Sequence, residues 1–251
     1  MSALIQMYRL LLLDIVVPVL LGLASFMDVK SREIDVYVFV AGIVASIPST
    51  ILSLKLLTSS PLGIVYLVQD ILVVGVVAGF TLLGLKGAAD LLAFLVIALA
   101  APTPLKAGGI FTPVFTCFFY YVIISIVPVV ALLVYNMARN RREIAQLPMP
   151  YKIIYPLIGV PKKARRLLED PGWWYPLNLC GYSVLFDINM DPEDIRKAVR
   201  EAVEKGCVSP EDKVWCSYGV PALPLILASY ILYLLLGSTP LLYFVKTLAG
   251  V

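Results

Sequence analysis

Apolar residues along this chain gather in long runs, and the charged residues lie mainly between the runs. Most of the runs have roughly 18 residues or more, which lets a helix cross about 30 Å of hydrocarbon. We expect helices, because a backbone in lipid has to satisfy its own N–H and C=O groups and the short alternation of β-barrel strands is missing. The pattern predicts an α-helical integral membrane protein with about six transmembrane helices. The expected spans are residues 9–27, 36–54, 64–84, 87–101, 112–136 and 221–246.

The segment between the fifth and sixth predicted helices differs from the rest, because it holds most of the charge of the chain. Within it, residues 182–188 are typical of a strand, and Asp191, followed by proline and two acidic residues, predicts a helix start. That helix is expected to end at Gly206, and a short strand near Val214 is expected to pair back. The predicted parts are residues 1–137 with five helices and the candidate catalytic groups, 138–218 with a small α/β cytoplasmic domain, and 219–251 with the sixth helix.

The basic residues of the loops predict the orientation in the membrane, because loops on the cytoplasmic side carry an excess of Lys and Arg. The loops after the first and third helices carry Lys30, Arg32 and Lys86, and a basic cluster follows the fifth helix. The loops after the second and fourth helices carry Lys55 and Lys106. The first, third and fifth loops are therefore expected in the cytoplasm, with both termini outside.

The composition agrees with a membrane protein and narrows the chemistry. Hydrophobic residues make up 60% of the chain and charged residues 15%, against about 25% charged residues in ordinary soluble domains. The chain has no histidine, which excludes Ser-His-Asp and Cys-His catalysis and histidine-ligated metals. Four cysteines without CxxC spacing predict neither a metal site nor a cofactor. Cys207 and Cys216 can bridge across a turn, but we expect both to be free, because cytosolic disulfides are unusual outside hyperthermophiles.

Four aspartates lie in or at the ends of predicted helices, where an ionisable side chain is costly and often functional. Asp28 ends the first helix and Asp90 opens the fourth, so both are expected near the cytoplasmic surface. Asp14 and Asp70 are expected near the outer surface. Two carboxylates held close together share a proton, and such a dyad can activate a water for attack on a peptide carbonyl. For each aspartate taken alone, a solvated residue at a helix boundary is the alternative interpretation.

The sequence Gly87-Ala88-Ala89-Asp90 resembles the GxGD motif of type IV prepilin and preflagellin peptidases. Asp28, which is followed closely by basic residues, resembles the first aspartate of that family. The six helices and the domain before the last helix are similar to the archaeal, preflagellin-peptidase branch. Two features depart from the family pattern: Ala89 replaces the second glycine of GxGD, and the Ile-Pro-Asn run that often follows the first aspartate of bacterial members is absent.

The resemblance implies a membrane-embedded aspartyl protease that removes the short basic class III leader from pilin or archaellin precursors. It implies that Asp28 and Asp90 share the base and acid roles, and it assigns Gly87 to substrate binding or to close packing. The expected partners are these precursors and membrane lipid, without nucleic acid. The expected location is the cell membrane, with several passes and the active site facing the cytoplasm.

Other functions are open from the residues. Residues 221–224, Pro-Ala-Leu-Pro, resemble the PAL motif of presenilin-like proteases, which cut within the membrane, although a proline-rich helix entry explains them too. A non-enzymatic transporter or scaffold is a further hypothesis. Asp14 and Asp70 are expected to be hydrogen-bonded partners that join the first and third helices, with a proton or ion pathway as the alternative.

Overall fold

The computed structural model describes residues 3–59, 61–104, 109–184 and 190–250. Apolar helices make up most of this part of the chain, as the hydrophobic pattern predicts. The apolar helices are α1 (Ala3–Leu11), the π-helical turn η1 (Leu12–Val16), α2 (Val17–Lys30), α3 (Val36–Ser59), α4 (Pro61–Leu82), α5 (Ala88–Ala100), α6 (Pro113–Arg139), α11 (Ala222–Leu236) and α12 (Thr239–Ala249).

The chain divides into two units. Unit 1 comprises residues 1–124 and 221–251, and unit 2 comprises residues 125–220. Unit 1 therefore holds the predicted aspartates together with the last two helices. Unit 2 corresponds closely to the charge-rich segment that the sequence separates from the membrane helices.

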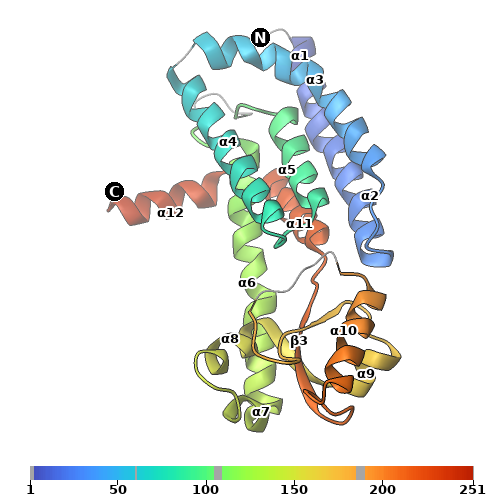
Figure 1. Ribbon diagram of the computed structural model, residues 1–251. Coiled ribbons are helices and arrows are strands. Elements are labelled where there is room, and N and C mark those ends of the chain that lie inside the picture. The colour runs from blue at the N-terminus through green and yellow to red at the C-terminus, as the bar shows by residue number, and fades with distance from the viewer. Residues whose placement is uncertain (1–2, 60, 105–108, 185–189, 251) are drawn as a thin grey trace. The chain divides into compact units, whose positions relative to one another are not determined.

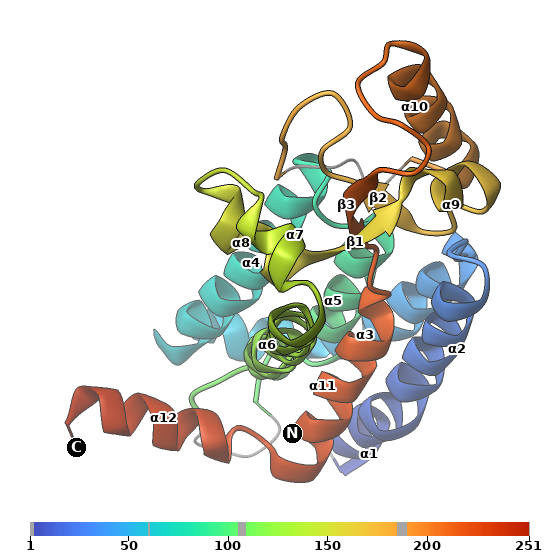
Figure 2. The same ribbon diagram turned by 90° about the horizontal axis from the view of Figure 1, so that it is seen from below.

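Helix α5 lies at the centre of unit 1, where it contacts α2, α3, α4 and α11 (Figure 1). Its residues are apolar around most of its circumference, as expected for a helix surrounded by others. Ala93, Phe94 and Ile97 are buried in the core of the unit. Helices α2 and α11 also lie side by side, which is clear in the second view (Figure 2). This packing brings the ends of α2, α5 and α11 into one region.

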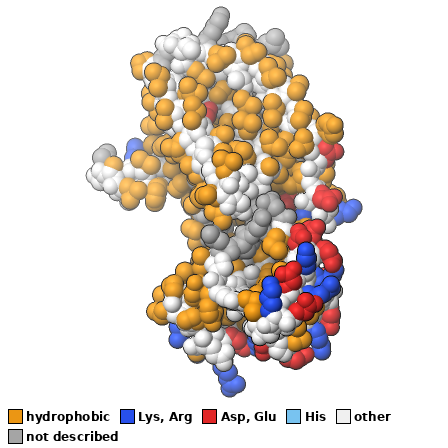
Figure 3. Space-filling model, viewed as in Figure 1, with side chains coloured by type: hydrophobic (Ala, Val, Ile, Leu, Met, Phe, Trp, Pro, Cys, Tyr) orange, Lys and Arg blue, Asp and Glu red, His pale blue; other side chains and the backbone are white. Residues whose placement is uncertain are grey.

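The outer surface of unit 1 is apolar. Figure 3 shows hydrophobic side chains over much of the visible face of this unit, whereas acidic and basic side chains gather on unit 2. Ile64, Ile71 and Leu235 are among the large apolar side chains that are mostly exposed. Such an extensive apolar surface is typical of contact with lipid. The predicted class, an α-helical multi-pass membrane protein, is confirmed.

The helices differ in length. In the described part of the chain, four are long and apolar enough to cross a membrane: Met7–Lys30, Val36–Ser59, Pro61–Leu82 and Pro113–Arg139. Helix α5 has only 13 residues, or about 20 Å at the α-helical rise, which is less than the thickness of about 30 Å of the hydrocarbon. The fourth predicted helix is therefore present but short.

The last predicted helix is not continuous. Helices α11 and α12 are long enough to cross a membrane only if they are taken together, and they are bent by 85° relative to each other. The bend occurs at Gly237, whose φ of 60° and ψ of −147° favour glycine. Tyr120 donates a hydrogen bond to the carbonyl oxygen of Gly237 at 2.9 Å. The predicted single helix over residues 221–246 is wrong because glycine permits, and Pro240 at the start of α12 favours, a new helix direction.

Unit 2 contains an antiparallel sheet of three strands in the described residues, in the order β1 (Gly159–Lys163), β3 (Lys213–Tyr218), β2 (Trp174–Pro176). The central strand β3 is buried along most of its length, whereas β1 is an edge strand and therefore tolerates Pro161. The remaining helices of the unit are α7 (Arg141–Ala145), α8 (Tyr151–Ile158), α9 (Ala164–Glu169) and α10 (Pro192–Glu204).

The predicted helix and one predicted strand of unit 2 are confirmed, whereas the other predicted strand is not. Helix α10 begins as expected: Asp191 accepts hydrogen bonds from the N–H groups of Glu193 and Asp194 in a capping box. The strand near Val214 is confirmed, although its partners are β1 and β2. The predicted strand over 182–188 is absent at residues 182–184, and residues 185–189 lie outside the described residues.

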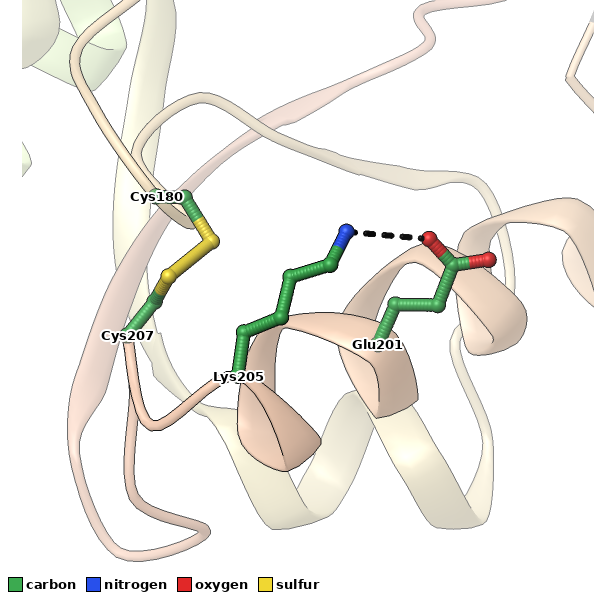
Figure 4. Close-up of a disulfide and its surroundings, with 4 residues drawn as sticks. All are labelled: Cys180, Glu201, Lys205 and Cys207. Atoms are coloured by element: carbon green, nitrogen blue, oxygen red, sulfur yellow. Dashed lines mark ion pairs between the residues drawn. A yellow bond between two sulfur atoms is a disulfide. The ribbon is translucent and has the colours of Figure 1, made fainter.

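A disulfide in unit 2 joins Cys180 to Cys207, with their Cα atoms 5.1 Å apart (Figure 4). It links the loop after β2 to the turn after α10, beside the ion pair between Lys205 and Glu201 at 3.5 Å. The expectation of a free Cys207 is therefore wrong, and so is the alternative of a bridge to Cys216. Cys216 is a buried free thiol because β3 directs its side chain into the core of the unit.

Candidate active site

Asp28 lies near the end of α2 and is only 7% exposed. Its Oδ2 atom accepts a hydrogen bond from the backbone N–H of Leu223 at 3.2 Å, and the N–H of Ala222 also contributes. These donors belong to the first turn of α11, where N–H groups have no partner within the helix. A carboxylate at a helix N-terminus is further stabilised by the helix dipole.

Arg32 adds a positive charge beside the same carboxylate. Its guanidinium Nη1 lies 3.9 Å from Oδ1 of Asp28. Arg32 has a φ of 60°, a left-handed conformation that is uncommon for a residue with a side chain. This conformation comes directly after the end of α2, where it turns the chain. Such backbone strain is most often retained where it serves a site.

Asp90 lies in the first turn of α5 and is also 7% exposed. Gly87 occupies the N-cap of this helix, and the N–H of Asp90 donates to the carbonyl oxygen of Gly87 at 3.1 Å. The Nζ atom of Lys86 lies 3.7 Å from Oδ2 of Asp90. The carboxylate is thus held at the start of the central helix of unit 1, next to a cation.

Lys86 connects the two aspartates electrostatically. Burial lowers the pKa of the Lys86 ammonium, while the negative charges of Asp90 and Asp28 act in the opposite direction. The charge of Asp28 also acts on Asp90. Asp28 and Asp90 are 62 positions apart in the sequence (90 − 28), yet both are buried and they interact electrostatically with Lys86 and with each other. Paired buried carboxylates of this kind can share a proton and activate water.

Gly87 stands beside open space. Its φ of −75° and ψ of 152° are accessible to any residue. A Cβ atom built at this position meets no described heavy atom within 4 Å. Close packing therefore does not require glycine here, which leaves room for another backbone to approach. Ala89, where the GxGD pattern has glycine, is partly buried and packs against the core of unit 1.

Asp14 and Asp70 have different surroundings. Asp14 is exposed in the π-helical turn η1 and interacts electrostatically with Tyr230 and Tyr233. Asp70 is buried in α4, where its side chain forms a hydrogen bond with Thr112, and its Oδ1 atom has no hydrogen-bond partner among the described residues. Both residues are described, and no hydrogen bond joins them, so they do not form the predicted pair. A π-helical turn carries an extra residue, which changes the direction of Asp14 relative to a regular helix.

Three groups at the site are missing from the sequence predictions: the N–H of Leu223, the ammonium of Lys86 and the hydroxyl of Tyr121. Tyr121 accepts a hydrogen bond from Lys86, whose Nζ lies 4.5 Å from the centroid of the tyrosine ring. A signal for Lys86 exists, since it precedes Asp90 by four residues. Residues 221–224 also indicate a helix start with free N–H groups.

Part of the chain matches a known protein family. Residues 151–239 match the family model described as Archaeal Peptidase A24 C-terminus Type II. No curated protein matches the chain. The matched range runs from the start of α8 to the bend after α11, and it contains Leu223 but neither Asp28 nor Asp90. The match and the two-carboxylate site thus come from different parts of the sequence.

Proposed function

We propose that this chain is an aspartyl endopeptidase of the type IV prepilin/preflagellin peptidase family that is embedded in the membrane, because residues 151–239 match the model of the archaeal A24 peptidase C-terminus. Its substrates are precursors of pilins or archaellins, from which it removes the short basic class III leader. The observation that carries the proposal is the burial of Asp28 and Asp90 in one site, where Lys86 interacts with both. Archaeal A24 peptidases are proteases, and this site contains the groups that cleavage requires.

The chemistry divides between the two carboxylates. One carboxylate accepts a proton from a water molecule, whose oxygen attacks the carbonyl carbon of the scissile peptide bond. The other, protonated, carboxyl donates its proton to the nitrogen of the leaving amine as the C–N bond breaks. Both proton transfers stay within the pair, so no histidine or metal is required. Asp28 and Asp90 perform these two roles, and the open space at Gly87 admits the backbone of the substrate.

The charges around the site favour the cytoplasmic face of the membrane. Lys30, Arg32 and Lys86 lie near the ends of the helices that carry the two aspartates, and basic residues mark cytoplasmic loops. The orientation places both termini outside. It also places the dyad on the side where the leader of a precursor remains, close to the start of the precursor's hydrophobic helix.

Cleavage by the wild-type protein is the test of this proposal. The full chain is reconstituted in vesicles with a precursor that carries a basic leader and a hydrophobic helix, and the products are identified by mass spectrometry. We expect one cut, between the leader and the helix. Leu223, which donates a hydrogen bond to Asp28, belongs to residues 221–224, which resemble the PAL motif of presenilin-like proteases. A presenilin-like protease is therefore the second candidate, and cuts within the hydrophobic helix would favour it. Absence of any cut would favour a transporter or scaffold.

The N-terminus of α11 offers a separate prediction. Ala222→Pro removes an N–H donor from Asp28 but suits the helix, because proline is favoured at the first helical position. The preceding residue, Pro221, has a φ of −60° and a ψ of 120°, which a following proline accepts. We expect cleavage to slow about tenfold, the equivalent of one hydrogen bond to a charged group. The measurement is kcat for leader cleavage in vesicles.

The control for this prediction is Ala222→Ser, which changes the side chain but keeps the N–H. It is expected to cleave faster than Ala222→Pro. Equal rates for the two variants would mean that the N–H of residue 222 does not support Asp28 in the reaction.

A further inference from the structure

Lys86 is a cation at the site to which neither the GxGD resemblance nor the matched range 151–239 assigns a role. It lies in the connection between α4 and α5, and its side chain is 25% exposed. Its Nζ atom has two polar neighbours among the described residues, Oδ2 of Asp90 at 3.7 Å and the hydroxyl of Tyr121.

The backbone before Lys86 is fixed by local hydrogen bonds. The N–H of Gly84 donates to the carbonyl oxygen of Thr81 at 3.0 Å, and the N–H of Leu85 donates to the carbonyl oxygen of Phe80 at 2.9 Å. These two bonds form a Schellman motif, which requires the left-handed conformation that Gly84 adopts with a φ of 68°. Lys86 follows this motif directly and precedes the N-cap of α5. Its side chain therefore starts from a defined position between two helices.

A lysine that serves only as a topological signal projects its ammonium into water or lipid headgroups. Lys86 does not follow this pattern, because its ammonium is largely buried and paired. The cost of burying a charge is offset only when opposite charges and hydrogen bonds surround it. Asp90, Asp28 and the Tyr121 hydroxyl provide this environment. In turn, a cation that is paired with Asp90 and interacts electrostatically with Asp28 reduces the repulsion between the two carboxylates.

We propose that Lys86 is a positioning residue for the cleavage reaction. It fixes Asp90 through the ion pair, Tyr121 orients its ammonium, and its charge also acts on Asp28, so that both carboxylates are held at one water molecule. This inference rests on the proposed function. Lys86 acts through the aspartates and does not itself contact the scissile bond.

The test compares three variants of the full chain in vesicles, with kcat and KM measured separately for leader cleavage. Lys86→Met keeps the length of the side chain but removes its charge, and we expect kcat to fall roughly a hundredfold with little change in KM. Lys86→Arg restores the charge and is expected to recover most of kcat. Tyr121→Phe removes only the hydroxyl and is expected to lower kcat by about three- to tenfold.

The matched control is Lys30→Met, which removes an exposed positive charge from the end of α2 near the same site. It is expected to leave kcat unchanged, which separates positioning from a general effect of charge. The inference is overturned if Lys86→Met keeps the wild-type kcat, or if Lys86→Arg loses as much as Lys86→Met. If Lys86→Met does not fold, the other two variants still test the inference. A wild-type kcat in Tyr121→Phe, or no activity in a folded Lys86→Arg protein, would contradict the role of Lys86.

The same assay distinguishes a failure of the proposed function from a failure of the proposed role of Lys86. A wild type that cuts the leader, together with a fully active Lys86→Met, overturns the role of Lys86 and leaves the peptidase intact. A wild type that cuts no leader overturns both the proposed function and the role of Lys86.

Discussion

Replacing either Asp28 or Asp90 by asparagine is expected to reduce leader cleavage at least about a thousandfold, since the loss of one member of a cooperating catalytic pair removes most of the rate enhancement. Asparagine has the shape of aspartate but neither accepts a proton from water nor donates one to the leaving amine. Both side chains are buried at the same site, where solvent cannot easily replace the missing carboxylate. The measurement is the rate of product formation in vesicles with a leader-bearing precursor.

Asp14→Asn is the matched control for the two aspartate variants. Asp14 is also a helical aspartate of unit 1, but it is exposed in η1 and bonds to neither member of the dyad. It is expected to remain active. Full activity in either Asp28→Asn or Asp90→Asn would rule out the two-carboxylate mechanism, whereas loss of activity in all three variants would indicate a general effect on the membrane helices.

Tyr155→Ala is expected to destabilise unit 2 by about 3–5 kcal/mol, the usual cost of removing a buried aromatic side chain. Tyr155 is fully buried in a cluster with Ile144, Leu177 and Trp215. Its hydroxyl lies 2.9 Å from the carbonyl oxygens of both Leu177 and Ser183. Burial raises the pKa of Tyr155 to about 12, so the hydroxyl remains a donor throughout the pH range in which the protein is handled.

Hydrogen exchange on the full chain measures this effect, with the amides of unit 1 as the internal reference. Tyr155→Phe separates the ring from the hydroxyl and is expected to cost about 1–3 kcal/mol, because buried carbonyl groups lose a donor. Ile153→Ala lies on the same helix, but Ile153 is 60% exposed, so little change is expected. Equal protection of unit 2 in Tyr155→Ala and Ile153→Ala would contradict the central role of Tyr155.

Local patterns in the sequence predict the elements that depend on neighbouring residues. The apolar runs predict the membrane helices, and Asp191 with Pro192 predicts the start of α10. Gly237 and Pro240 indicate the break between α11 and α12. Hydropathy alone does not reveal the break, because the apolar run continues across these two residues. The shortness of α5 agrees with the sequence, because the fourth expected span, residues 87–101, is already shorter than its neighbours.

Contacts between distant segments are harder to predict, and the site depends on them. The position of each aspartate at a helix end is visible in the sequence, whereas the donation from Leu223 to Asp28 joins residues 195 positions apart. The disulfide has the same difficulty, because the partner of Cys207 depends on how the loop after β2 returns to α10. Edge strand β1 was not predicted, since its Gly-Val-Pro-Lys-Lys sequence has little strand character without β3 beside it.

The short helices have a consequence for the lipid around the site. Helix α5 has 13 residues and α11 has 15, or about 20 and 22 Å, and both begin beside the two aspartates. Longer helices surround α5, whereas α11 exposes Ile231 and Leu235, so the hydrophobic thickness is reduced where α11 faces the lipid, and the bilayer adapts to such mismatch by thinning locally. Local thinning brings the headgroup region and its water nearer to the buried carboxylates. The length of the acyl chains in the host membrane therefore affects how near water comes to the two carboxylates.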